Sequence, residues 1–229
     1  MKIVFAPDWF LRSDVLIEFV SFLVLATFFI LSYKNYKLSK NKKSLYLGLG
    51  FLLIAIAELA TIFTKLILYY DTSFTQIIGH MAVTYNVVKS VDIFYYLGFF
   101  FHKLLTLLGL YVIYRIPAKK RDSKEAVFAV YFILVSAFFS SAFYYIFHLT
   151  ALVFLIFIIG NYLDVYKKNK SGNTEMLVAA FSMLALSHTI FILSQLQILY
   201  VIGQIIQLVS YLILLFLIIR ILRATKKKT

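Results

Sequence analysis

Seven long hydrophobic segments follow one another along nearly the whole chain, and they constrain its fold more than any other feature. The segments cover about residues 12–34, 44–70, 91–114, 125–142, 144–166, 174–197 and 199–222. A membrane-spanning helix needs roughly 20 apolar residues, and strand-like alternation of polar and apolar residues is absent. Because only helices and closed barrels cross a bilayer, the sequence predicts an all-α integral membrane protein, with one seven-helix domain over residues 1–229.

The composition excludes other classes of protein. Of the 229 residues, 62% are hydrophobic and 14% charged, against roughly 45–50% and 25% in soluble domains. A soluble globular domain, a disordered chain and a coiled coil are therefore excluded. Seven helices also leave too few residues for a separate catalytic or ligand-binding domain, so we expect the protein to act inside the membrane or on short loops. The chain has no cysteine, which excludes disulfides and thiol catalysis.

Two stretches leave the helix count and the loops open. Segments 125–142 and 144–166 are joined only around residues 140–142, and six helices with one re-entrant element is the alternative to seven. In residues 71–90, apolar side chains recur at helical spacing, which predicts a short amphipathic helix on the outer surface, as a connector or as a lid.

The distribution of basic residues predicts the orientation. Eighteen of the 23 lysines and arginines lie in four polar breaks: Lys34, Lys37, Lys40, Lys42 and Lys43; Arg115, Lys119, Lys120, Arg121 and Lys124; Lys167, Lys168 and Lys170; Arg220, Arg223, Lys226, Lys227 and Lys228. Cytoplasmic loops carry an excess of such residues. We therefore expect a multi-pass protein of the cell membrane, with its N-terminus outside and its C-terminus cytoplasmic. This orientation accounts for the net charge of +13, so the expected partner is the lipid bilayer and not nucleic acid.

Ionisable residues inside spans are functional candidates, because each is costly unless it faces the bundle interior. Glu58 shares a helix face with Lys65, and His102 and Lys103 lie near the middle of the third span. The second and third spans run antiparallel, so we expect Glu58 and Lys103 to meet as an ion pair that fixes the helix register. A ligand or proton site is the alternative. Asp14 is expected among the lipid headgroups, and Glu18 one turn inside.

The last two spans carry further polar side chains on single faces. These side chains predict either interhelical hydrogen bonds or a polar pocket in the outer half of the bundle. The expected pocket residues are Glu58, His102, Lys103, His188, Gln195, Gln204 and Gln207, with Glu18, Lys65 and Tyr211 as secondary members.

Motifs for enzyme chemistry are missing, so we expect no catalytic residues and regard an enzyme as the weaker hypothesis. The four histidines are never three or four residues apart, which gives no metal-ligand pair on one helix. Although the layout is like that of rhodopsins, residues 207–211 contain no lysine at the usual retinal position. No cofactor is therefore expected.

The last span carries a resemblance to a known class. Residues 203–211, followed by apolar residues and Arg220-Ile221-Leu222-Arg223, resemble the last helix of small prokaryotic seven-helix membrane-sensor modules, the type found ahead of histidine kinases and cyclases. The resemblance implies a sensor or receptor that binds a small or lipidic ligand in the bundle. Because the chain carries no output domain, the signal is expected to pass to a partner protein. The alternatives are a small proton-coupled carrier, with Glu58, Lys103 and His188 as a relay, and a structural subunit of a membrane complex.

Overall fold

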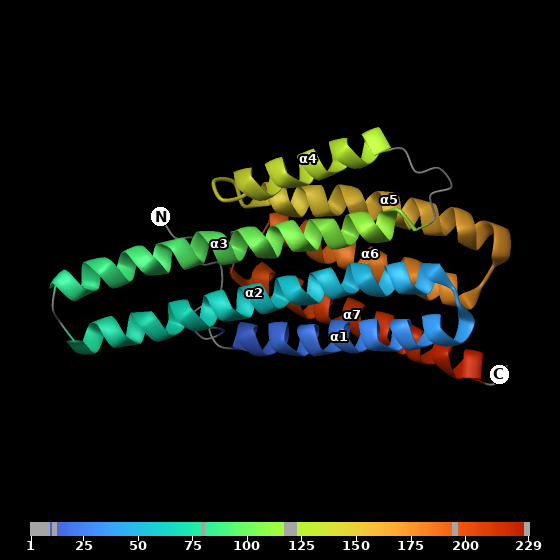
Figure 1. Ribbon diagram of the computed structural model, residues 1–229, viewed down its shortest axis with the longest axis horizontal. Coiled ribbons are helices and arrows are strands. Elements are labelled where there is room, and N and C mark those ends of the chain that lie inside the picture. The colour runs from blue at the N-terminus through green and yellow to red at the C-terminus, as the bar shows by residue number, and fades with distance from the viewer. Residues whose placement is uncertain (1–9, 11–12, 79–80, 117–122, 194–196, 227–229) are drawn as a thin grey trace.

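The protein is described by a computed structural model that covers residues 10, 13–78, 81–116, 123–193 and 197–226. These residues form seven α-helices and no strand, which confirms the all-helical prediction (Figure 1). The helices are α1 (Ser13–Ser39), α2 (Lys42–Ile78), α3 (Met81–Tyr114), α4 (Ser123–Phe139), α5 (Tyr145–Asn169), α6 (Gly172–Ile192) and α7 (Gln197–Lys226).

Six of the helices in the described residues are long and apolar enough to cross a membrane: α1, α2, α3, α5, α6 and α7. The exception is α4, which has 17 residues. At about 1.5 Å per residue it is roughly 25 Å long, shorter than the hydrocarbon core of about 30 Å. A turn at residues 140–144 separates α4 from α5, so the two segments are distinct helices. That α4 crosses the membrane remains a prediction.

The helices run nearly parallel to one long axis, and successive connections alternate between its two ends (Figure 1). The end that holds the α1–α2, α3–α4 and α5–α6 connections, together with the end of α7, is called the basic end, because the lysine-rich and arginine-rich breaks lie there. The opposite end is called the far end. At the basic end, α1 and α5 are each followed by a lysine in the left-handed conformation, Lys40 (φ 56°) and Lys170 (φ 42°).

Residues 71–90 do not form the separate surface helix that the sequence predicts. Residues up to Ile78 continue α2, and those from Met81 onward belong to α3. The two helices thus project beyond the rest of the bundle at the far end (Figure 1). The spacing of the apolar residues indicated a helix correctly, but the helix is an extension of the spans.

Glycines allow α2 and α3 to pack closely along much of their length. A Cβ atom at Gly109 would lie 2.6 Å from the carbonyl oxygen of Gly50, and one at Gly98 would collide with the Thr64 side chain. Such contacts are closer than any residue with a side chain allows. The α2–α3 pair is therefore a fixed wall of the bundle.

A hydrophobic cluster fills the half of the bundle nearer the basic end. At its centre, the Phe51 ring meets Phe28 edge-to-face at 4.7 Å and stacks on Phe181 at 6.3 Å, measured between ring centroids. Leucine and isoleucine side chains from α3, α5, α6 and α7 pack around it. By contrast, α4 lies at the edge of the bundle, where Val127, Phe128 and Tyr131 are between 64% and 71% exposed. A surface of this kind suits contact with lipid.

Candidate functional site: a polar cavity in the far half of the bundle

A cavity of about 640 Å³ lies between the helices, and all seven helices contribute to its wall. Eight of the ten residues that the sequence predicts for the pocket line it: Glu18, Glu58, Lys65, His102, Lys103, His188, Gln204 and Gln207. Tyr211 is not part of the wall but contacts it through Gln207. Gln195 lies outside the described residues.

The rest of the wall is largely aromatic. Phe100 of α3, Phe147 of α5 and Phe191 of α6 line the cavity between the polar groups. Two lining residues on α3, Tyr96 and Leu97, are about half exposed on the surface of the bundle, and Phe138 at the end of α4 is 68% exposed. The cavity therefore reaches the surface between α3 and the end of α4.

Lys65 forms the strongest polar cluster of the site, with residues from α1 and α7. Its Nζ donates hydrogen bonds to Asp14 Oδ2 (2.7 Å), Glu18 Oε1 (2.5 Å) and the Tyr200 hydroxyl (3.1 Å). The side chains of Asp14, Glu18 and Lys65 are all buried. The expectation that Asp14 lies among lipid headgroups is thus wrong, because this carboxylate points inward and neutralises Lys65.

Glu58 is bound to α7 and not to α3. The Gln207 Nε2 donates to Glu58 Oε1 (3.3 Å) and to the Tyr211 hydroxyl (2.9 Å). One turn earlier, Gln204 Nε2 donates to the Tyr200 hydroxyl (3.2 Å). Of these two glutamines, Gln207 joins α7 to α2, whereas the hydrogen bond of Gln204 stays within α7; both line the cavity.

The predicted ion pair between Glu58 and Lys103 is not formed. Lys103 Nζ instead donates to the main-chain carbonyl of Ser140, at the end of α4 (2.8 Å). The predicted depth was sound, because the neighbouring His102 contacts the Ala57 carbonyl oxygen through its Nδ1 (3.2 Å). Successive residues of a helix point about 100° apart, so His102 faces α2 while Lys103 faces α4.

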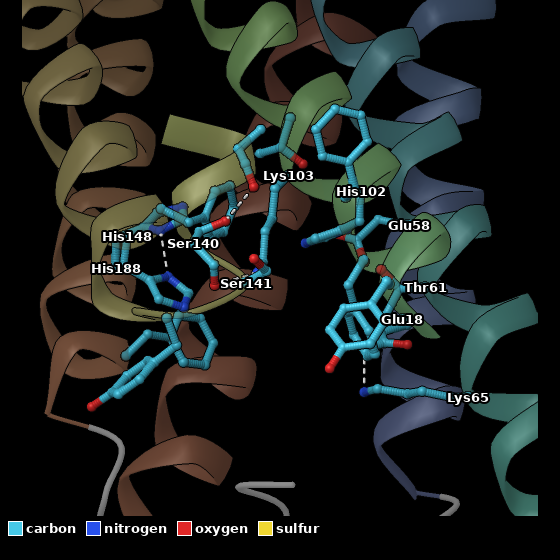
Figure 2. A pocket seen from close by; sticks show the side chains of 18 of the residues that line it. Glu18, Glu58, Thr61, Lys65, His102, Lys103, Ser140, Ser141, His148 and His188 are labelled. Atoms are coloured by element: carbon cyan, nitrogen blue, oxygen red, sulfur yellow. Dashed lines mark hydrogen bonds and ion pairs between the residues drawn. The ribbon is translucent and has the colours of Figure 1, made fainter. Parts of the chain in front are cut away.

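A pair of histidines forms the opposite side of the cavity. His148 of α5 and His188 of α6 face each other with 3.1 Å between their Nδ1 atoms, so one ring donates and the other accepts. In Figure 2 the pair lies to one side of Lys103, and the Glu18–Lys65 group lies to the other. Among the described residues no group of three or more acidic, histidine or cysteine side chains is arranged to hold a metal ion.

Sequence reasoning missed several members of the site, among them Asp14, His148 and Ser140. A signal existed for Asp14, since it and Lys65 are nearly equidistant from the turn at Lys40 and therefore lie at one depth in antiparallel helices. His148 has no histidine three or four residues away in the sequence, and its partner, His188, lies on the next helix. The Ser140 contact uses a main-chain carbonyl, which no side-chain pattern reports.

Two polar atoms of the lining residues have no hydrogen-bond partner, although they are buried. They are Glu18 Oε2 and Thr106 Oγ1. An unpaired buried polar group costs about 1–3 kcal/mol. Both oxygens are enclosed by protein atoms and are not exposed at the cavity surface.

The fold and the cavity define a class: an all-helical protein, compatible with a multi-pass membrane protein, that encloses a polar site with aromatic walls. No family model, no curated protein and no solved structure matches the chain.

Proposed function

We propose that the protein is a membrane sensor or receptor that binds a small or lipidic ligand in the cavity and acts through a partner protein. The observation that carries this proposal is the cavity itself. Its volume of about 640 Å³ falls within the roughly 300–1,000 Å³ of typical ligand sites. Its wall combines aromatic surface with a few polar groups from separate helices, which is the usual composition of such sites.

The position of the charges supports ligand binding over transport. In the described residues, the charged side chains that are fully buried are Asp14, Glu18, Glu58 and Lys65, and all lie in the far half. The hydrophobic cluster around Phe51 separates them from the basic end. A carrier needs polar access from both sides, so this layer argues against the proton-coupled alternative.

The proposed orientation places the basic end in the cytoplasm, in a cell membrane, because lysine and arginine accumulate in cytoplasmic loops. The basic end then also carries the surface that a cytoplasmic or membrane partner contacts. In this orientation the cavity lies in the outer half of the membrane.

Photolabelling tests the proposal directly. The full chain, reconstituted in nanodiscs, is irradiated with a dodecanol that carries a diazirine in its chain, and the labelled residues are mapped by peptide mass spectrometry. We expect labels on Phe100, Phe147 and Phe191 inside the cavity, in addition to lipid-facing positions such as Phe157.

A cavity-filling variant provides the matched control. Ala137→Phe adds a ring to a buried residue of the cavity wall, and it should remove the interior labels while Phe157 stays labelled. Labels confined to lipid-facing residues in the unmodified chain would contradict ligand binding. Proton-coupled uptake of a solute into liposomes that Glu58→Gln abolishes would instead favour the carrier.

A further inference from the structure

Within the described residues, Lys103 differs from Lys65, the other cation of the cavity, in having no acidic partner. Lys65 contacts two carboxylates, whereas no carboxylate in the described part of the chain lies within 4 Å of Lys103. Its ammonium carries three N–H groups, and the hydrogen bond that it forms goes to the Ser140 carbonyl. A largely buried cation of this kind lacks a counterion, and burial of an unpaired charge is costly.

Thr106 follows Lys103 by three residues, so the two side chains lie on one face of α3 and both line the cavity. The Thr106 hydroxyl oxygen has no hydrogen-bond partner in the described part of the chain, but it is enclosed by protein atoms and is not exposed at the cavity surface. The ammonium of Lys103 is therefore the group that can receive a carboxylate here.

Beyond Lys103, the lining toward the cavity mouth is apolar apart from Tyr96 and Ser141. Phe100 lines the wall on α3, and Leu97 and Phe138 carry the lining out to the exposed surface between α3 and α4. A hydrocarbon chain in this position contacts aromatic side chains along its length and reaches the bilayer at its end.

We infer that the ligand is a long-chain carboxylate, with its headgroup on Lys103 and its chain directed to the opening between α3 and α4. One cation balances one negative charge, which favours a carboxylate over a phosphate monoester carrying nearly two. The inference rests on the proposed function, because it names the chemical class of ligand that the cavity takes.

Competition against the diazirine dodecanol tests the headgroup. The competitors are dodecanoate, dodecanol, dodecylamine, dodecyl phosphate and acetate, and the readout is the concentration that halves labelling of Phe147. Dodecanoate should compete about tenfold better than dodecanol, the effect of roughly one charge-assisted hydrogen bond. Acetate, which lacks the chain, should not compete.

Variants assign the preference to Lys103. Lys103→Met should reduce the tenfold preference for dodecanoate to within about twofold, and Lys103→Arg should retain most of it. Thr106→Val, which changes a hydroxyl enclosed in the wall, should alter the preference by less than about twofold. Lys168→Met, which removes an exposed lysine of the basic end, is the matched control and should leave the preference unchanged.

The outcomes separate this inference from the proposed function. If dodecanol labels the interior but dodecanoate competes no better than dodecanol, or keeps its advantage in Lys103→Met, the carboxylate inference is overturned while ligand binding stands. Stronger competition by dodecylamine would place the ligand headgroup on the acidic residues of the cavity. Stronger competition by dodecyl phosphate would identify the headgroup as a phosphate. Either result overturns the inference. If dodecanol does not label the interior at all, the proposed function itself fails.

Discussion

Removal of the Lys65 ammonium should destabilise the bundle more than any other single substitution in the cavity wall. In Lys65→Met, the carboxylates of Asp14 and Glu18 stay buried but lose the cation that lies 2.7 and 2.5 Å away. Loss of one partner from a buried ion pair costs about 3–5 kcal/mol. Because two carboxylates lose their counterion here, we expect the upper part of that range.

The assay is reversible unfolding of the full chain from mixed micelles by sodium dodecyl sulfate, followed by near-ultraviolet circular dichroism as a report of tertiary packing. Lys168→Met, at an exposed position, should change the free energy of unfolding by less than about 0.5 kcal/mol. The triple variant Asp14→Asn/Glu18→Gln/Lys65→Met removes all three charges and should recover most of the loss, because uncharged polar groups replace unpaired ions. A loss of less than about 1 kcal/mol in Lys65→Met would refute the reasoning.

Two further substitution sets test packing between helices in the same titration. Gly109→Ala should cost about 1–3 kcal/mol, because its Cβ would meet the Gly50 carbonyl oxygen. Gly160→Ala, whose Cβ meets no atom within 4 Å, should be neutral or slightly stabilising, and equal losses at the two sites would contradict the close α2–α3 contact. Ser136 and Thr150 share a buried hydrogen bond of 2.8 Å between α4 and α5. A double-mutant cycle of Ser136→Ala and Thr150→Val should yield a coupling of about 0.6 kcal/mol, and zero coupling would place α4 elsewhere.

The hydrophobic pattern predicted the helices well and their ends poorly. Hydropathy reports the apolar part of a helix, and the helices of this chain continue past it into polar sequence. The segment predicted over 12–34 is helical to Ser39, and the one predicted over 44–70 is helical from Lys42 to Ile78. The segment at residues 71–90, predicted as a separate short surface helix, instead contributes residues up to Ile78 to α2 and residues from Met81 onward to α3.

For the site, depth was predictable and direction was not. Span positions placed Glu58, His102 and Lys103 at one level, and all three line the cavity. Which side chain faces which helix depends on rotations that a sequence without tertiary contacts does not specify. Lys103, the expected partner of Glu58, is one step of about 100° around α3 from His102, which faces α2 instead. Main-chain partners such as the Ser140 carbonyl are hidden from any pattern of side chains.

The cluster around Lys65 also bears on how the chain enters a membrane. Lysine at the centre of an isolated helix disfavours insertion by roughly 2.5–3.5 kcal/mol. Both carboxylates that bind Lys65 belong to α1, and Lys65 itself belongs to α2, so all three charges are synthesised before α3–α7. The first hairpin therefore contains the counterions of its own cation, and Tyr200 of α7, which is synthesised later, adds a hydrogen bond to Lys65.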